Sequence, residues 1–596
     1  MRPIINIKEA EGKRKFREVA YQTALLVKKY KGSLSGEHGD GRLRGEFIQL
    51  LYGDEVYALM QDLKHCWDPL QAFNLHKIVD TLPMDSMLRF EVDQQYAIEK
   101  ELGRSALRQA QGPLGIKTYY NWKAAFDECK VEGATGAKTQ LHALMCSIEQ
   151  CNGAGDCRKS NLIGGTLCPA FKVSGDETKA TRARANVLRE ILTRGWASEA
   201  FIVANCVPQF DKNTSSNCKT QFATMKNILK SEELAEVLDS CLACKGCRSE
   251  CPSNVDMTRL RSEILQQKYN VSGMPLRSFA VSYMATVEQL GHIVWPFYNL
   301  FASWKFSSNI IKRIIKFTTE RDIPTLSRVT MRTAVKRESQ RHKRQTTKGK
   351  FYLFADEFTN FQEAELGLTF AKLLLHLGYK VEIPKHVESG RAAISKGNLK
   401  LAKKFALKNV YLLKDKISEQ TPLVGIEPSC ILSFRDEYPD LVPAELRPQA
   451  QQLGRNALLF DEFIMREVAA GRISADDFKT DAVEIWLHGH CHQKALVGTE
   501  KTVAALKLLQ GAKVHVIPSG CCGMAGSFGY EKEHYQTSLA IGEMVLFPTI
   551  RKAVANADGV IPCIVSAPGT SCRQQILDGT GVHAVHPIEI LYRWVK

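Results

Sequence analysis

Four closely spaced cysteines constrain this chain more than any other feature of its sequence. They stand at 241, 244, 247 and 251, and Pro252 follows the last, so the spacing is C-x2-C-x2-C-x3-C-P. Three cysteines at intervals of three residues wrap one corner of a 4Fe–4S cube, while the fourth ligates the other cluster of a two-cluster protein. Zinc is the alternative metal, although its motifs seldom run three cysteines at this pitch. The motif therefore predicts iron–sulfur clusters.

A second motif upstream supplies most of a partner site. Cys151 and Cys157 flank Ala154, which takes the middle cysteine position, and Cys168 precedes Pro169. The exchange of the fourth ligand between clusters assigns one cluster to Cys168, Cys241, Cys244 and Cys247, and the other to Cys151, Cys157 and Cys251. The remaining ligand is either Cys146 or missing, in which case the site holds a three-iron cluster. Cys206 and Cys218 are interpreted as core thiols.

Length and composition favour a cytoplasmic protein of several domains. The chain has 596 residues and 18 cysteines, a cysteine density below that of disulfide-rich secreted scaffolds, and its start has no apolar segment typical of a signal peptide. Residues 279–304 are the most apolar stretch, but Glu288 and His292 lie within it, so we do not predict a spanning helix. Peripheral contact with the inner face of a membrane remains an alternative.

The positive charge is concentrated in one segment. Residues 305–350 carry 14 Lys and Arg against 3 Asp and Glu, out of a net charge of +16 for the chain. No helix-turn-helix, zinc-finger or RNA-stacking signature accompanies this run, so nucleic acid is not predicted as a partner. We interpret the segment as a solvated linker, with a membrane surface as the functional alternative because aromatic residues and cations interleave over residues 295–317.

From residue 351 onward, short apolar strands alternate with helices, which predicts a parallel α/β architecture. The pattern occurs twice. Each half runs strand, helix, strand, a Gly-bearing loop (388–397 or 519–529), helix, strand, and a Pro-containing loop that ends at Cys430 or Cys572. We expect two related modules that face each other.

The second half resembles a known class of cysteine-rich module. HGHCHQKALVG at 488–498 and GCCGMAGSFGYE at 520–531, following the paired cluster motifs, are similar to the iron–sulfur subunits of glycolate and lactate oxidases and to the catalytic subunit of heterodisulfide reductases. The resemblance implies CCG modules that bind a further cluster. Its ligands would be Cys491, Cys521, Cys522 and Cys572, while Cys563 is off the pattern. A structural thiol pair is the alternative for Cys521 and Cys522.

The first half departs from that pattern. Glu388 and Ser389 stand where the adjacent cysteines are expected, and Glu427 and Cys430 occupy the place of a C-x2-C pair. This half is therefore predicted to have lost its cluster and to serve as a scaffold.

The N-terminal region resembles a different family. GSLSGEHGDGRLRGEF at 32–47 is similar to the C-terminal cap of FAD-linked oxidases of the D-lactate and D-2-hydroxyglutarate dehydrogenase type. The resemblance implies a loop against flavin and substrate, in which Gly36, Gly39 and Gly41 let the backbone approach a planar ring. His38 is the candidate base for the substrate hydroxyl or a ligand that polarises it, and Glu37 beside it is a candidate catalytic or metal-binding carboxylate. A helix-capping role for this pair is the alternative. Weaker candidates are Asn74 and Lys77 on the flavin side, and Arg42 and Arg44 for a substrate carboxylate.

Together these features predict a multidomain α/β and α+β chain. Its parts are an oxidase cap fragment (1–84), a linker or arm (85–140), a helical two-cluster ferredoxin-like domain (141–270), a basic helical linker (271–350), a degenerate CCG module (351–450) and a second CCG module (451–596). We expect a D-2-hydroxy-acid dehydrogenase that uses FAD and 4Fe–4S clusters.

The chain's partners follow from that expectation. The flavin-binding half of such enzymes precedes the cap, so FAD would be shared with a missing N-terminal half or a separate polypeptide. The electron acceptor would be a quinone, a cytochrome or an electron-transfer protein. The alternatives are a non-catalytic electron carrier that docks to a flavoprotein, and a heterodisulfide reductase-like CCG protein.

Overall fold

The computed structural model describes residues 10–86, 118–122, 137–192, 229–342, 348–557 and 559–596, and the single positions 5, 7 and 88. The chain forms two compact units, one of residues 1–114 and 196–222, the other of residues 115–195 and 223–596. Cys129, Cys206 and Cys218 lie outside the described residues.

The first unit is a small helical assembly with a modest core. Its elements are α1 (Ala10–Lys29), the short helices η1 (Gly45–Phe47) and α2 (Ile48–Tyr52), and α3 (Asp54–Trp67). Ala24 of α1, Phe47 and Met84 are buried together. The Glu46 side chain fixes the far end of the unit, since its Oε2 accepts a hydrogen bond of 2.7 Å from the Met84 amide. The Gly-rich loop lies between α1 and this packed turn.

The second unit begins with a helical region that carries both cysteine motifs. Its elements are α5 (Ala137–Glu149), η3 (Asp156–Arg158), α6 (Pro169–Ser174), η4 (Glu177–Lys179), helical residues 181–192, α9 (Glu232–Asp239), α10 (Gly246–Glu250) and α11 (Met257–Ser272). The α11 helix is the centre of this region. Its buried Glu263 accepts hydrogen bonds from the amides of Tyr119 and Tyr120, so residues 118–122 lie on this helix.

Short helices follow where the basic linker was expected. They are α12 (Leu276–Ser282), α13 (Met284–Ile293), α14 (Trp295–Ser303), α15 (Lys305–Ile314) and α16 (Met331–Arg341). Consecutive helices from α12 to α15 pack on one another, and α16 packs on α18. Among the described residues, no helix combines the length and apolar character that crossing a bilayer requires.

Two parallel sheets form the rest of the unit. The first has the strand order β2-β1-β3-β4, from β1 (Gly349–Leu353), β2 (Tyr379–Glu382), β3 (Leu423–Gly425) and β4 (Ala457–Leu459). The second has the order β6-β5-β7, from β5 (Val483–Leu487), β6 (Ala512–Val516) and β7 (Cys563–Ser566). The α/β pattern predicted from residue 351 onward is confirmed, and the order of β1, β2 and β3 repeats in β5, β6 and β7.

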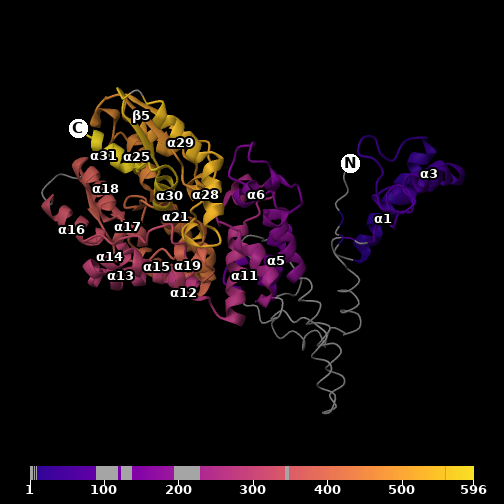
Figure 1. Cartoon of the computed structure of the whole chain (residues 1–596), viewed down its shortest axis with the longest axis horizontal. Coiled ribbons are helices and arrows are strands. Elements are labelled where there is room, and N and C mark those ends of the chain that lie inside the picture. Colours follow the sequence, from indigo (N-terminus) through magenta and orange to yellow (C-terminus); the bar gives the residue numbers. More distant parts are fainter. Residues whose placement is uncertain are drawn as a thin grey trace, which may run out of the picture. The chain divides into compact units, whose positions relative to one another are not determined.

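Helices pack against both sheets (Figure 1). Those of the first module are α17 (Glu357–Phe361), α18 (Ala364–His376), α19 (Arg391–Ser395), α20 (Leu399–Leu413), α21 (Pro428–Ile431), α22 (Ser433–Asp436), α23 (Tyr438–Leu441), η5 (Ala444–Leu446) and α24 (Arg447–Arg455). After β4 come α25 (Phe460–Ala469), η6 (Ala475–Asp477), α26 (Cys491–Leu496), α27 (Glu500–Leu506), η7 (Phe528–Tyr530), α28 (Tyr535–Met544), α29 (Leu546–Ala555), α30 (Thr570–Thr580) and α31 (Pro587–Trp594).

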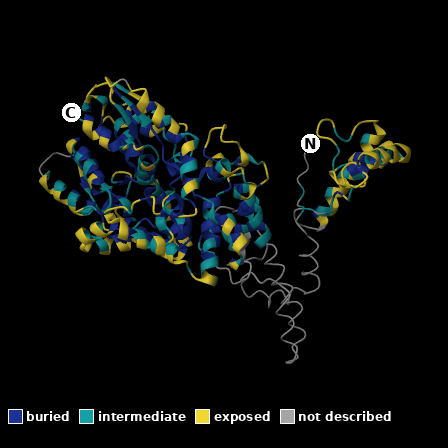
Figure 2. Ribbon diagram, viewed as in Figure 1, coloured by how far each residue is buried: buried dark blue, intermediate teal, exposed yellow. Residues whose placement is uncertain are grey.

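The two sheets share one apolar core. Phe351 and Phe370 of the first half belong to the same buried cluster as Ile485, Leu591 and Trp594 of the second. Figure 2 shows this interior as a continuous buried region. The two halves are therefore packed as one body, in which loops at the carboxyl ends of both sets of strands approach each other.

Candidate functional site

The C-x2-C-x2-C motif folds around a buried position that it shares with Cys168. The loop reverses direction through left-handed backbone at Ala243 (φ 53°) and Lys245 (φ 62°), and Cys247 lies in the first turn of α10. Arg184, with 1% of its surface exposed, lies 3.6 Å from the Cys168 sulfur through Nη1. The charges of Cys168, Cys241 and Cys247 all act on this guanidinium.

The electrostatics of this loop suit a bound cation. Burial, reinforced by Cys491 and then Cys247, raises the pKa of Cys244 well above its usual range. Burial also raises the pKa of Cys247, with Asp256 and Cys241 adding to the shift. Several buried sulfurs that resist ionisation in one another's presence would ionise when an iron centre supplies positive charge. The residues therefore fit the four-cysteine cluster assigned from the sequence.

A second cavity lies between the two cysteine motifs. Its lining includes the sulfur-bearing residues Cys151, Cys157 and Cys251, together with Ala154 in the middle cysteine position. The Arg182 amide donates a hydrogen bond of 3.3 Å to the Cys157 sulfur. Cys146, on α5, is not among the lining residues. The donor set thus fits an iron–sulfur cluster with three cysteine ligands.

Four cysteines of the second module also converge. Cys491 begins α26 after β5, Cys521 and Cys522 follow β6, and Cys572 lies in the first turn of α30 after β7. A hydrogen bond from Cys521 lowers the pKa of Cys491 to about 6. Hydrogen bonds from Cys521 and Cys572 likewise lower the pKa of Cys522. Loops after three adjacent parallel strands therefore deliver a thiol-rich centre of the kind that a soft metal needs.

The remaining cysteine of this module stays apart from the centre. Cys563 is on β7, and its sulfur faces the Ala553 carbonyl at 3.9 Å.

Two residues beside this centre were not predicted. His488 places a ring nitrogen within 4.8 Å of the sulfurs of Cys522 and Cys572, and its Nδ1 lies 2.7 Å from Ser519 Oγ. Glu427, from the first module, accepts a hydrogen bond of 2.9 Å from the Thr570 amide, two residues before Cys572. The dense HGHCH string was the available signal for His488. Glu427 stands in the place of a cysteine of the C-x2-C pair, but the sequence did not indicate its contact with the second module.

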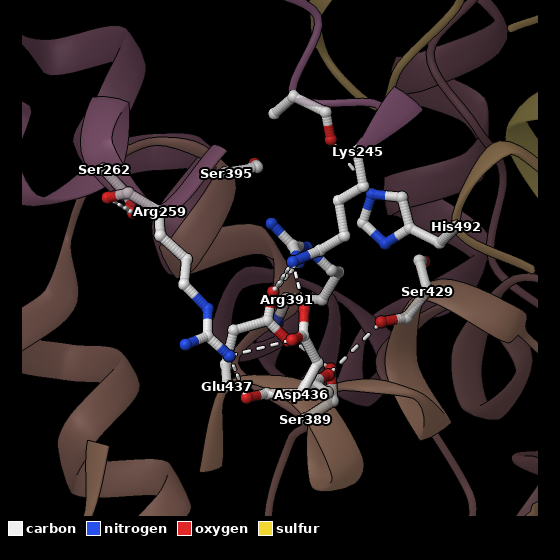
Figure 3. A network of polar contacts seen from close by, with 12 residues as sticks. Lys245, Arg259, Ser262, Ser389, Arg391, Ser395, Ser429, Asp436, Glu437 and His492 are labelled. Carbon is white, nitrogen blue, oxygen red and sulfur yellow. Dashed lines mark hydrogen bonds and ion pairs between the residues drawn. The ribbon is translucent and has the colours of Figure 1, made fainter. Parts of the chain in front are cut away.

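A buried ionic network joins the first cluster loop to the first module (Figure 3). Lys245, between Cys244 and Cys247, pairs with Asp436 and lies 2.9 Å from Glu437 Oε1. Arg391 pairs with the same Glu437 at 2.8 Å. On the opposite side, His492 of α26 lies 3.0 Å from the Ala243 carbonyl. The cluster loop is thus fixed by both modules.

The candidate flavin-side residues lie on the open surface of the first unit. His38 Nε2 lies 2.9 Å from Glu37 Oε1, and both side chains are more than three-quarters exposed. Gly36, Gly39 and Gly41 have no atoms within 4 Å of where a Cβ would stand, so a planar ring has room to approach their backbone. The capping interpretation is not supported here, because the following helix η1 starts after Arg44 without a side-chain cap.

The weaker candidates of this unit are partnered locally. Lys77 donates a hydrogen bond of 2.8 Å to Asn74 Oδ1. Arg42 donates to the Ser86 carbonyl at 2.9 Å and Arg44 to the Gly39 carbonyl at 3.0 Å. These contacts hold the Gly-rich loop in shape.

Comparison with known proteins assigns the N-terminal region to a class. Residues 1–78 match the family described as FAD linked oxidases, C-terminal domain. This confirms the resemblance inferred from residues 32–47.

Individual relatives extend the similarity along the chain. D-2-hydroxyglutarate dehydrogenase of Escherichia coli (strain K12) is 25% identical over 620 aligned positions, which cover 100% of this chain and 55% of that protein. The enzyme of the same name from Pantoea ananatis (strain AJ13355) is also 25% identical, over 99% of this chain and 54% of its own length. The chain thus spans about half the length of these curated relatives.

A shorter relative matches part of the chain. It is one of the subunits of the anaerobic glycerol-3-phosphate dehydrogenase of E. coli (strain K12), and it is 27% identical over 57% of this chain and 82% of its own length. No solved structure shows a significant match.

Proposed function

We propose that this chain is the electron-transferring part of an FAD-dependent D-2-hydroxy-acid dehydrogenase, acting on a substrate of the D-2-hydroxyglutarate or D-lactate type. One observation carries the proposal: a chain whose N-terminal region matches an FAD-linked oxidase domain also folds three groups of converging cysteines. When bound, FAD would supply a hydride acceptor for the substrate, and the iron–sulfur clusters would supply one-electron carriers.

The chain's own residues have distinct tasks in this scheme. His38 takes the proton of the substrate hydroxyl, and Glu37 orients the imidazole through its contact of 2.9 Å. Gly36, Gly39 and Gly41 keep the loop open to the flavin, and Asn74 with Lys77 flanks it. FAD is held jointly with a flavin-binding polypeptide.

We assign three iron–sulfur sites to the second unit. Cys168, Cys241, Cys244 and Cys247 hold the first, and Cys151, Cys157 and Cys251 hold the second. Cys491, Cys521, Cys522 and Cys572 hold the third, in the second CCG module. Because the charge of Cys491 acts on Cys244 and α10 packs on α26, the first and third sites lie close enough for electron transfer between them. The acceptor is a quinone, a cytochrome or an electron-transfer protein in the cytoplasm or at its membrane.

Anaerobic purification with iron and sulfide analysis and low-temperature EPR tests the clusters. We expect a brown protein with iron and acid-labile sulfide and with reducible S = 1/2 signals. A colourless protein, or one holding only zinc, would refute the assignment.

Co-expression with a flavin-binding polypeptide of the same oxidase class tests the dehydrogenase role. Adding D-2-hydroxyglutarate or D-lactate should bleach the flavin and reduce the clusters in the pair. His38→Gln should slow bleaching by about a hundredfold or more. His65→Gln, a half-exposed histidine of the same unit, is the control and should leave the rate unchanged.

The similarity to part of the anaerobic glycerol-3-phosphate dehydrogenase favours one second candidate, a non-catalytic electron carrier that docks to a separate flavoprotein. The same co-expression experiment distinguishes the two. Full turnover by the flavin-binding polypeptide without this chain, and wild-type bleaching in His38→Gln, would support the carrier.

A further inference from the structure

The helices α12 to α15 turn their apolar side chains outward. Thirteen large apolar residues between 276 and 314 are exposed, from 46% at Ile310 to 75% at Ile293. They are Leu276, Phe279, Val287, Leu290, Ile293, Val294, Phe297, Leu300, Phe301, Trp304, Phe306, Ile310 and Ile314, which we call the apolar face. Figure 2 shows exposed residues along these helices. Soluble surfaces seldom gather apolar residues in this number.

Five polar residues of the same helices are buried. Ser282, Glu288, Ser307, Ser308 and Lys312 are each no more than 3% exposed. Their hydrogen bonds are made inside the protein: Ser307 Oγ donates to the Phe301 carbonyl at 2.7 Å, and Glu288 accepts from Gln362. The apolar side chains of these helices therefore face outward, whereas these polar side chains face the protein interior. Buried polar contacts fix this orientation.

The charge of this segment has one sign. Glu288 is the only acidic residue between 276 and 316, and burial raises its pKa to about 8, so it is mainly neutral at pH 7. Lys305 and Arg313 are exposed on α15, and Lys316 is exposed two residues after its end. An apolar face with cations and no exposed carboxylate is complementary to an anionic lipid surface, whereas protein interfaces are depleted of lysine.

The length of these helices determines whether they could span a bilayer or lie on its surface. The four helices have 7 to 10 residues, so each is at most about 15 Å long. The hydrocarbon layer of a bilayer is about 30 Å thick. The helices can lie in the headgroup region with their aromatic side chains in the acyl boundary, as interfacial helices do.

We propose that α12 to α15 form a docking surface for an anionic lipid bilayer, on which the chain binds peripherally. Phe297, Ile293 and Trp304 insert, and Lys305, Arg313 and Lys316 contact lipid phosphates. This surface is separate from every cysteine site, so the proposal stands or falls independently of the dehydrogenase function.

Flotation of the full chain with lipid vesicles is the test. Vesicles of equal parts phosphatidylglycerol and phosphatidylcholine should carry the wild-type chain, and vesicles of phosphatidylcholine alone should carry less of it. Phe297→Asp, at a side chain 74% exposed, should lower the partition coefficient by about tenfold to a hundredfold. Lys305→Gln should lower it by about fivefold, and only at low salt.

Val554→Asp on α29 is the matched control, because it places the same charge at an exposed apolar residue away from the apolar face. It should float as the wild type does. Equal flotation of wild type and Phe297→Asp, or no flotation at all, overturns the proposal. A wild-type mass that is twice the chain and falls with Phe297→Asp would likewise overturn it, and would assign the face to a second copy.

Discussion

The two α/β modules use the same strand order to build different chemistry. Glu357 and Cys491 each stand four residues after the end of their strand, at Leu353 and Leu487. Where the second module brings Cys522 and Cys572 to Cys491, the first brings Ser389 and Cys430 to Glu357. Ser389 Oγ donates a hydrogen bond of 2.6 Å to Glu357 Oε1 and contacts the Cys430 thiol. A carboxylate, a hydroxyl and a thiol thus fill the space that thiols occupy in the second module.

The electrostatics of the two sites differ. In the first module, burial raises the pKa of Glu388 to about 8 and that of the Cys430 thiol well above its usual range. In the second, hydrogen bonds from neighbouring thiols lower the pKa of Cys491 and of Cys522. The same hydrogen bonds raise the pKa of their partners Cys521 and Cys572, so the second site divides its protons between paired thiols, whereas the first site favours protons. The loops after the strands, rather than the sheet, determine whether a module can hold a metal cluster.

Replacing one thiol in each module should give the largest contrast. Cys522→Ser should remove the iron of the third site, because a ligand between Cys521 and Cys572 is lost. Cys430→Ser should leave the iron content unchanged, since Cys430 is bonded within the first module. Iron and sulfide analysis of both variants measures the effect. Equal iron loss in the two would mean that the first module also binds a cluster.

Breaking the buried network at Lys245 should destabilise the protein by about 1.5–3 kcal/mol. Lys245→Met removes one buried cation from Asp436 and Glu437, which retain Arg259 and Arg391 as partners. Arg551→Ala, which removes an exposed pair with Glu543 in the second module, should cost under about 1 kcal/mol. Urea unfolding gives both values. A small loss in Lys245→Met would show that the first module does not anchor the cluster loop.

The modules should lose stability in different pH windows. Burial, with Glu357, raises the pKa of Asp356 to about 8. An acid with a raised folded pKa contributes stability that is full below its unfolded pKa of about 4 and is lost as pH rises toward 8, on the order of 1 kcal/mol per unit. Asp356→Asn, which retains an N-cap for α17, should flatten this loss in urea unfolding.

In the second module, burial alone would lower the pKa of His534, but hydrogen bonds to Asp239 and Glu531 raise it to about 9. Its stabilisation is full below about pH 6.5 and is lost as pH rises through 9. Lys396 and Arg277 also pair with Glu531, so this carboxylate keeps cationic partners in His534→Gln. The variant should therefore remove only the loss of stability between about pH 6.5 and 9. A wild-type stability that rises between pH 5 and 9 would contradict both expectations.

The smallest expected change tests a missing ligand outside the modules. Ala154→Cys adds a thiol to the cavity of Cys151, Cys157 and Cys251, and should raise the iron content by one atom per chain with loss of any three-iron EPR signal. Cys146→Ser should change neither. Iron loss in Cys146→Ser would identify Cys146 as the fourth ligand.

The sequence was most informative where spacing is rigid. The C-x2-C-x2-C motif predicted which cysteines share a site with Cys168, because a cube corner fixes the intervals. The alternation of strands and helices predicted parallel sheets. It did not indicate that β4, which lies after the module boundary expected at residue 450, pairs with β3 of the first module. A strand of three residues has almost no periodic signal.

Contacts between distant segments could not be predicted. Glu427 reaches the loop of Cys572 across 143 positions, and His492 reaches Ala243 across 249. The outward orientation of α12 to α15 was indicated only as an alternative, by the interleaved aromatic residues and cations of residues 295–317. The exposed fractions of the apolar face and the buried contact of Glu288 with Gln362 establish it.

The contact between Glu427 and Thr570 has a consequence for dissecting the molecule. The Glu427 carboxylate of the first module holds the turn of the second module that carries Cys572. Deleting the first module would therefore release the turn that carries a cysteine ligand of the second module. We expect that neither module functions as an isolated fragment.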